Sequence, residues 1–101
     1  MLAQFTVFPV GARESLSKEV AKVIDFIDRS GLPYTVTAMS TVVEGNWDEV
    51  MALIKKCHMS MKRSHGRIYT SIVIDDRKGA VRRLTGKVDD VEKILKRKLH
   101  R

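Results

Sequence analysis

The sequence has few cysteines, prolines and aromatic residues: its 101 residues include one Cys, two Pro and 6% aromatic side chains. The single thiol, Cys57, cannot form an intramolecular disulfide, a cysteine-pair metal site or a dithiol redox centre. No apolar run approaches the roughly 18 residues of a membrane-spanning helix, and the first residues lack the basic and apolar segments of a secretory signal. We therefore expect one domain, residues 1–101, in the cytoplasm and without membrane association.

The motifs of the common enzyme classes are also missing. His58, His65 and His100 do not have the spacing of paired metal ligands, and the six glycines form neither a dinucleotide-binding motif nor a phosphate-binding loop. Ser15 and Ser17 lie outside any nucleophile-elbow motif and are better suited to capping a helix. The sequence therefore predicts a protein that is not an enzyme, with no catalytic residues, no metal site and no cofactor.

The basic residues are concentrated in the last two fifths of the chain. The formal net charge is +7, but residues 1–61 carry 6 basic and 7 acidic side chains whereas residues 62–101 carry 13 and 5. Such an excess is typical of nucleic-acid binding, which also needs aromatic side chains for base stacking. In the candidate strand at residues 66–73 only Tyr69 could stack, so we interpret the basic segment as a solvated surface and do not expect nucleic acid.

One alternative for the basic segment stays open, namely that it binds nucleic acid or an anionic ligand. The basic residues that would do so are Arg77, Lys78, Arg82, Arg83, Lys87 and those of the final predicted helix.

Hydrophobic periodicity predicts seven elements. Alternating or β-branched segments predict strands at residues 2–8, 34–38, 41–44 and 67–75. Apolar stripes at helical spacing predict helices from Ser15 or Ser17 to Arg29, at residues 47–62 and at residues 88–99. This order is that of an α+β ferredoxin-like βαββαβ sandwich with an extra C-terminal helix. In that fold two helices cover one face of an antiparallel sheet, so the other face is free to meet a partner subunit or a ligand.

A carboxylate, two hydroxyls and an aromatic ring occur close together in the middle of the chain. Thr37 and Thr41 precede Glu44, and Trp47 follows it at the start of the second predicted helix. A flat cationic heterocycle would find here a counter-charge, hydrogen-bonding groups and a ring face. The alternative, which these residues alone leave open, is that Glu44 caps or charges the N-terminus of the second helix.

Short segments spread over nearly the whole chain resemble a known family. They are Pro9, Val10 and Gly11 after the first strand; residues 15–17 and 19–21; residues 30–32 with Tyr34; the run MSTVVEG at 39–45, followed by residues 48–50; and residues 67–70 with 74–77. In this order and spacing, the segments make the chain resemble the thiamine-binding protein family, also called the UPF0045 or YkoF-like family.

The resemblance implies a ferredoxin-like subunit that assembles as a dimer of dimers through sheet surfaces. It also implies that thiamine, or its aminopyrimidine moiety, binds near a subunit interface without catalysis. Glu44 would then pair with the thiazolium charge or a ring nitrogen, and Thr37 and Thr41 would orient the pyrimidine edge. The ring faces would come from aromatic residues, namely Phe5, Phe8, Trp47 or Tyr69.

We therefore predict that the protein binds thiamine or a related aminopyrimidine for storage, salvage or sensing. Two alternatives to this prediction remain. One is the nucleic-acid or anion binding described above, and the other is an oligomeric interaction protein without a ligand.

Overall fold

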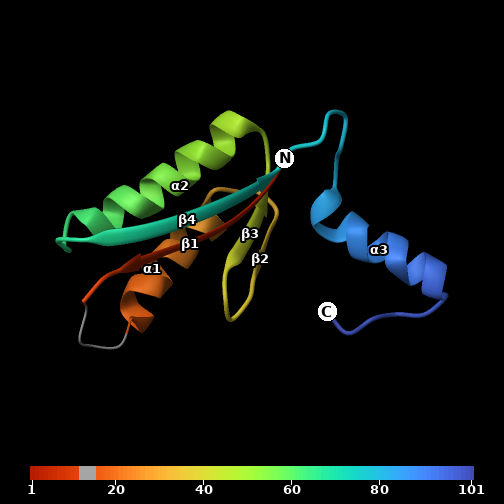
Figure 1. The fold of residues 1–101 in the computed structure, drawn as a ribbon, viewed down its shortest axis with the longest axis horizontal. Coiled ribbons are helices and arrows are strands. Elements are labelled where there is room, and N and C mark those ends of the chain that lie inside the picture. The colour runs from red at the N-terminus through yellow and green to blue at the C-terminus, as the bar shows by residue number, and fades with distance from the viewer. Residues whose placement is uncertain (12–15) are drawn as a thin grey trace.

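The computed structural model describes residues 1–11 and 16–101, so the predicted capping residue Ser15 lies outside the described residues. The elements are β1 (Leu2–Pro9), α1 (Ser17–Arg29), β2 (Tyr34–Val36), β3 (Thr41–Glu44), α2 (Trp47–Lys62), β4 (Ile68–Asp75) and α3 (Arg83–Leu95) (Figure 1). This order confirms the predicted α+β sandwich with an added C-terminal helix.

The four strands form one antiparallel sheet in the order β2-β3-β1-β4. β1 is central: β3 pairs with its first half, from Leu2 to Phe5, and β4 pairs with its whole length. Because side chains alternate along a strand, Ala3, Phe5 and Val7 point to one face of the sheet and the residues between them to the other. The sheet therefore has one apolar face and one mixed face, as the sequence predicts.

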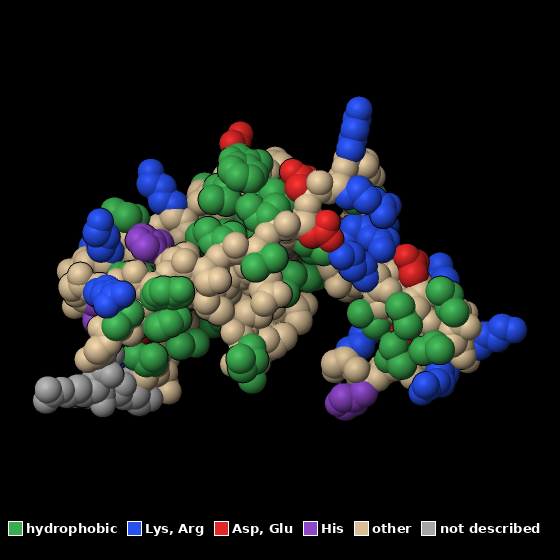
Figure 2. Space-filling model, viewed as in Figure 1, with side chains coloured by type: hydrophobic (Ala, Val, Ile, Leu, Met, Phe, Trp, Pro, Cys, Tyr) green, Lys and Arg blue, Asp and Glu red, His purple; other side chains and the backbone are tan. Residues whose placement is uncertain are grey.

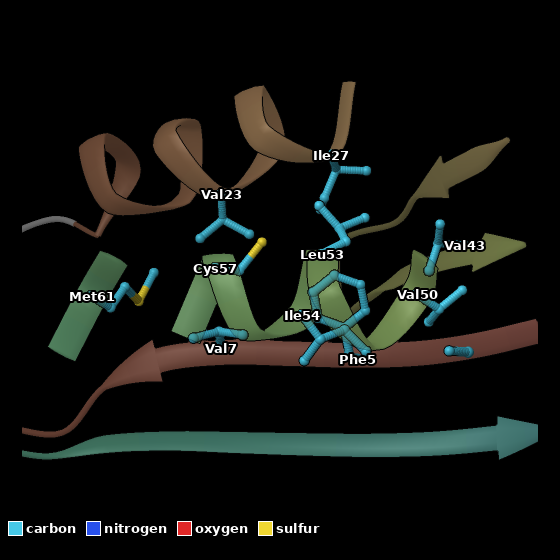
Figure 3. Close-up of a cluster of buried hydrophobic side chains, with 11 residues drawn as sticks. Phe5, Val7, Val23, Ile27, Val43, Val50, Leu53, Ile54, Cys57 and Met61 are labelled. Carbon is cyan, nitrogen blue, oxygen red and sulfur yellow. The ribbon is translucent and has the colours of Figure 1, made fainter. Parts of the chain in front are cut away.

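α1 and α2 pack together over the apolar face of the sheet and enclose the core (Figure 3). The apolar stripes predicted for the two helices supply most of its residues. The buried set is Ala3, Phe5, Val7, Val23, Ile27, Val43, Val50, Leu53, Ile54, Cys57 and Met61. Removing this apolar surface from water, at about 25 cal/mol per Å², is the main term that stabilises the sandwich. Among the described residues, no helix covers the opposite face of the sheet, and we call it the open face.

The starts of α1 and α2 are built differently. At α2, the Glu49 backbone N–H donates to the Asn46 side chain at 2.8 Å and the Asn46 backbone N–H donates to the Glu49 carboxylate at 3.2 Å, which is a capping box. At α1, Leu16 occupies the N-cap position and Ser17 is already the first helical residue. The prediction that Ser17 caps α1 is therefore wrong, because a cap must precede the helical backbone.

α3 differs from its prediction in both bounds and position. It begins at Arg83 rather than at residue 88, and it ends where Lys96 adopts a left-handed backbone with φ 58°. Leu99, which we expected in the helix, lies in a tail that folds back, with its N–H donating to the Glu92 carboxylate at 2.6 Å. α3 projects away from the sandwich, apart from α1 and α2 (Figure 1), and the molecule is 48 Å long but only 28 by 21 Å across.

Candidate functional site

A cavity of about 230 Å³ opens between α1, the second half of β1 and the β2–β3 hairpin, and we call it the hairpin cavity. It brings together four of the seven residues predicted to bind a ligand, namely Phe5, Phe8, Thr37 and Thr41. The remaining residues that line it are Thr6, Val7, Val20, Val23, Ile24, Val36, Ala38, Met39 and Ser40. Because this lining is aliphatic and aromatic apart from a few hydroxyls, the cavity suits a flat and largely apolar ring.

The Thr37 hydroxyl holds the hairpin turn together. Its Oγ1 donates to the Ser40 carbonyl at 3.0 Å and accepts the backbone N–H groups of Met39 and Ser40 at 3.2 and 3.1 Å. A hydroxyl has one proton to donate and two lone pairs that accept, so these three bonds use its full capacity. Thr37 therefore shapes the cavity wall, and it can bond a ligand only by giving up part of the turn.

The Thr41 hydroxyl is placed differently. Thr41 is only 6% exposed, on the face of β3 that carries Val43 into the core, and it lines the hairpin cavity. Within the described residues its hydroxyl makes no hydrogen bond. Because Thr41 lines the cavity, this oxygen stays accessible to a ligand or a water molecule, to which it can both donate and accept. Thr41 is therefore the polar group of this cavity that is best placed to orient a ligand.

The predicted aromatic residues lie on both faces of the sheet. Phe5 is buried at 2% exposure and forms part of the cavity wall and the core. Phe8 and Tyr69 face each other on the open face, with ring centroids 5.5 Å apart and planes tilted by 32°. Trp47 is the first residue of α2 and is 55% exposed. The rings therefore do not converge on one point, and Phe8 alone belongs to the open face while also bordering the hairpin cavity.

Glu44 lies at the far end of β3 from the hairpin cavity. Its carboxylate accepts the backbone N–H of Arg83 at 2.7 Å and that of Leu84 at 3.1 Å, so it caps the N-terminus of α3. We expected, as the alternative, that Glu44 caps the second helix. Glu44 does cap a helix, but that helix is α3, and Asn46 caps α2. Glu44 and Thr41 are three positions apart in one strand, which places their side chains on opposite faces.

Glu44 belongs to a second cavity, of about 200 Å³, beside the start of α3. We call it the basic cavity, and its lining is Met1, Leu2, Glu44, Asp75, Arg77, Ala80, Arg83 and Lys87. The sequence motif at residues 37–47 therefore splits in the structure. Its threonines face the hairpin cavity, its carboxylate faces the basic cavity, and Trp47 lines neither.

The nucleophilic and titratable side chains of the core are occupied by structural roles. Burial raises the pKa of the Cys57 thiol to about 11, so the reactive thiolate is scarce at neutral pH. His58 Nδ1 lies 2.6 Å from the Thr70 hydroxyl and joins α2 to β4. Within the described residues no cluster of three His, Cys, Asp or Glu side chains could hold a metal ion, and no helix is long and apolar enough to cross a membrane.

Nine lining residues of the hairpin cavity lie outside the predicted ligand-binding set, and Val20 and Met39 show why. Val20 belongs to the predicted buried stripe of α1 but is 47% exposed, because it borders the cavity. Met39 belongs to the predicted link between two strands and to the run at residues 39–45, but neither pattern predicts that it lines a cavity. Periodicity identifies which face of an element is apolar, but the spacing between α1 and the hairpin decides whether that face packs or lines a cavity.

Comparisons with known proteins agree with the sequence motifs. The profile of the family described as thiamine-binding protein matches residues 3–92. A UPF0045 protein of Mycobacterium bovis is 36% identical over 98 residues, which cover 96% of each chain. The chain therefore belongs to the thiamine-binding protein family.

Solved structures share the fold. A protein of Methanocaldococcus jannaschii has a TM-score of 0.81 and 29% sequence identity, and the match covers 91% of this chain and 95% of that one. A Thermotoga maritima protein, provisionally assigned to thiamine biosynthesis or salvage, has a TM-score of 0.77 over 89% of this chain and 96% of its own. Its identity of 23% makes it a likeness of fold alone.

Proposed function

We propose that this protein binds thiamine or a related aminopyrimidine without transforming it, and that the hairpin cavity receives the pyrimidine ring. Family membership supports a thiamine-related role. The observation that carries the choice of site is that Thr41, a residue only 6% exposed, lines the cavity with a hydroxyl that has no partner within the described residues. Storage, salvage or sensing in the cytoplasm would each use such binding.

The chemistry of the cavity matches that of an aminopyrimidine. The ring has apolar faces, which suit Phe5 and the valines of the lining, and an edge with adjacent donor and acceptor atoms, which suits a hydroxyl that can do both. The volume of about 230 Å³ is below the roughly 300–1,000 Å³ of sites for drug-sized ligands. One ring of thiamine therefore fits inside, with the charged thiazolium at the mouth.

The proposed role of Glu44 is a separate matter. Within one chain its carboxylate faces the basic cavity rather than the hairpin cavity, so it does not reach a ring bound beside Thr41. Pairing of Glu44 with the thiazolium stays a prediction, and it requires that two copies bring these surfaces together. Glu44→Gln tests this pairing separately from the hairpin cavity. An unchanged thiamine affinity would show that Glu44 does not bind the ligand, and it would not contradict binding in the hairpin cavity.

Isothermal titration of the protein with thiamine, and with the aminopyrimidine alone, tests the site. Thr41→Val keeps the shape of the side chain but removes the hydroxyl, and loss of one hydrogen bond of about 0.5–1.5 kcal/mol weakens binding roughly 3- to 10-fold. Thr35→Val is the matched control, because Thr35 is exposed and does not line the cavity. Absence of heat at millimolar ligand, or equal effects of the two variants, would overturn the proposal.

We further propose that the chain forms a homo-oligomer, a dimer of dimers. α3 exposes apolar side chains along its length, namely Val91, Ile94 and Leu95. The open face likewise exposes Phe8, Tyr69 and Val73. A projecting helix of 13 residues gains little stability by itself, so burial against a second copy explains both surfaces.

Light scattering coupled to size exclusion tests the assembly. We expect a mass of four chains at micromolar concentration, and a smaller species for Val91→Asp on α3 and for Val73→Asp on the open face. The exposed Met59→Asp on α2, a residue that is in the lining of neither cavity, serves as the comparison for added charge alone. A wild-type monomer overturns this part of the proposal, whereas a tetramer that gives no heat with thiamine favours an interaction protein without a ligand.

A further inference from the structure

We propose that the basic cavity at the start of α3 is a second binding site, for a small oxyanion with the chemistry of a phosphate group. Its volume is about 200 Å³. Sites for drug-sized ligands have volumes of roughly 300 Å³ or more, so this cavity suits a smaller ligand. Three cationic side chains and two carboxylates line it, namely Arg77, Arg83, Lys87, Glu44 and Asp75. The site is independent of the hairpin cavity, with which it shares no residue.

The fold brings the three cations together from two segments. Arg77 opens a turn closed by the Ala80 N–H, which donates to the Arg77 carbonyl at 3.0 Å, and Gly79 supplies the positive φ of 76° that the turn needs. Arg83 and Lys87 are one helical turn apart and share a face of α3. The helix is held in place because its first N–H groups bond to Glu44, so the cavity is a built feature of the fold.

The two carboxylates of the cavity already have partners. The Asp75 carboxylate accepts a hydrogen bond from the Lys87 ammonium at 2.7 Å, and the Glu44 carboxylate accepts hydrogen bonds from two backbone N–H groups of α3. Within the described residues Arg77 makes no ion pair. Arg83 reaches only Asp90, which lies outside the lining, at 3.3 Å through one of its five N–H donors. The donors that remain for a ligand are therefore the guanidinium N–H groups of Arg77 and Arg83 and the two Lys87 N–H groups that do not bond to Asp75.

The electrostatic effect of the cations is felt inside the cavity. The hydrogen bond from Lys87 lowers the pKa of Asp75 below its ordinary value, and the charges of Arg77 and Arg83 lower it further. Asp75 therefore lies within the field of all three cations. Guanidinium groups bind tetrahedral and planar oxyanions through pairs of parallel N–H donors, which favours phosphate over a monatomic anion.

A small oxyanion fits the cavity better than nucleic acid does. Figure 2 shows Lys and Arg side chains gathered where the chain leading to α3 meets the sandwich, with acidic side chains beside them. The part of the lining that the structure describes contains no aromatic side chain, so it offers no ring on which a base could stack. The carboxylates Glu44 and Asp75 would also repel a continuous phosphate backbone, whereas one anion can avoid them.

Titration with inorganic phosphate at low ionic strength, followed by calorimetry and by amide chemical shifts, tests the proposal. Arg77→Gln removes a lining charge, and Lys78→Gln is the matched control, because Lys78 is the next residue of the same turn and does not line the cavity. We expect saturable binding that shifts the amides of Arg77, Ala80 and Lys87. We expect Arg77→Gln to weaken it about tenfold or more and Lys78→Gln less than about twofold.

Three results would overturn the site. The first is the absence of a saturable chemical-shift change with phosphate. The second is an equal loss of phosphate affinity in Arg77→Gln and Lys78→Gln. The third is binding of a single-stranded oligonucleotide, with a steep salt dependence, by a protein that does not bind phosphate itself. Comparing the affinity for a phosphate monoester with that for inorganic phosphate shows whether the site prefers an esterified ligand or the free ion. Thiamine titration of Arg77→Gln should match that of the wild type, so failure of the hairpin cavity and failure of this site remain distinguishable.

Discussion

The Glu44 carboxylate accepts the backbone N–H of Arg83 at 2.7 Å, although the two residues are 39 positions apart in the chain. A second bond, from the Leu84 N–H at 3.1 Å, makes the contact bidentate. The end of β3 thereby supplies the N-terminal cap of α3, whose own preceding residue, Arg82, has a left-handed backbone and makes no side-chain cap. Glu44 is therefore the link between the sandwich and its projecting helix.

Replacing Glu44 with Ala should loosen the start of α3. Loss of a capping carboxylate costs about 1–2 kcal/mol, and we expect faster hydrogen exchange at the Leu84 amide together with a lower urea midpoint. Asp76→Ala, which removes an exposed carboxylate without a described partner, is the control. Equal exchange at Leu84 in the two variants would show that the cap contributes nothing measurable.

The capping box of α2 gives a second stability prediction. Asn46→Ala leaves the Glu49 N–H without its acceptor and should lower the free energy of unfolding by about 1 kcal/mol, measured by urea denaturation. Asn46→Asp keeps a side-chain oxygen at the same place and adds a charge that favours the helix N-terminus, so it should lose little. A destabilisation of equal size in both variants would contradict the role of the box.

Cys57 should be unreactive in the folded protein. Its pKa of about 11 lies two units above that of an ordinary thiol, so the thiolate is roughly 100-fold scarcer at pH 8, and its burial also blocks access. A colorimetric disulfide reagent should therefore label it slowly in buffer and rapidly in denaturant. Labelling in buffer at the rate of free cysteine would place the thiol at the surface.

The tail after α3 should detach in acid. The hydrogen bond from the Leu99 N–H and then that from Arg101 lower the pKa of Glu92, and the hydrogen bond from Arg101 lowers that of Asp89. A carboxylate whose pKa is lowered on folding stabilises the folded form above its ordinary pKa, here 4.5 and 3.8, and loses that contribution as pH falls through the lowered value.

The Leu99 amide resonance measures this release. We expect its chemical shift to move toward a random-coil position as the pH is lowered from 6 through the range below about 4. Glu92→Gln should show a weakened tail already at pH 7 and little further change in acid. An acid transition of the same size in that variant would assign the titration to another group.

Much of the fold could be predicted from the sequence because its elements satisfy local rules. α2 begins and ends at the predicted residues 47 and 62, and β3 at 41 and 44, since apolar spacing and flanking glycines mark them. The start of α3 could not be predicted in this way, because its cap comes from Glu44 in a distant strand. The Asn46 and Glu49 pair, in contrast, has the spacing of a capping box and was open to sequence reasoning.

The candidate site shows the same division. Thr41 and Glu44 are separated by an odd number of positions in a predicted strand, so their placement on opposite faces follows from the period of two. The period of two does not predict that Val20 and Met39 line the hairpin cavity, because their position there depends on the distance between α1 and the hairpin. Proximity in sequence thus misleads for the motif at residues 37–47, which contributes to two cavities rather than one.

The sequence by itself determined the order of elements, the apolar face of each, and the family, because these depend on spacing along the chain. It also located the positive charge in the last two fifths. Only the tertiary structure decided where that charge acts: Arg77, Arg83 and Lys87 surround one cavity because a turn and a capped helix meet at the end of β3. Contacts between residues distant in sequence set this geometry, and no local pattern encodes them.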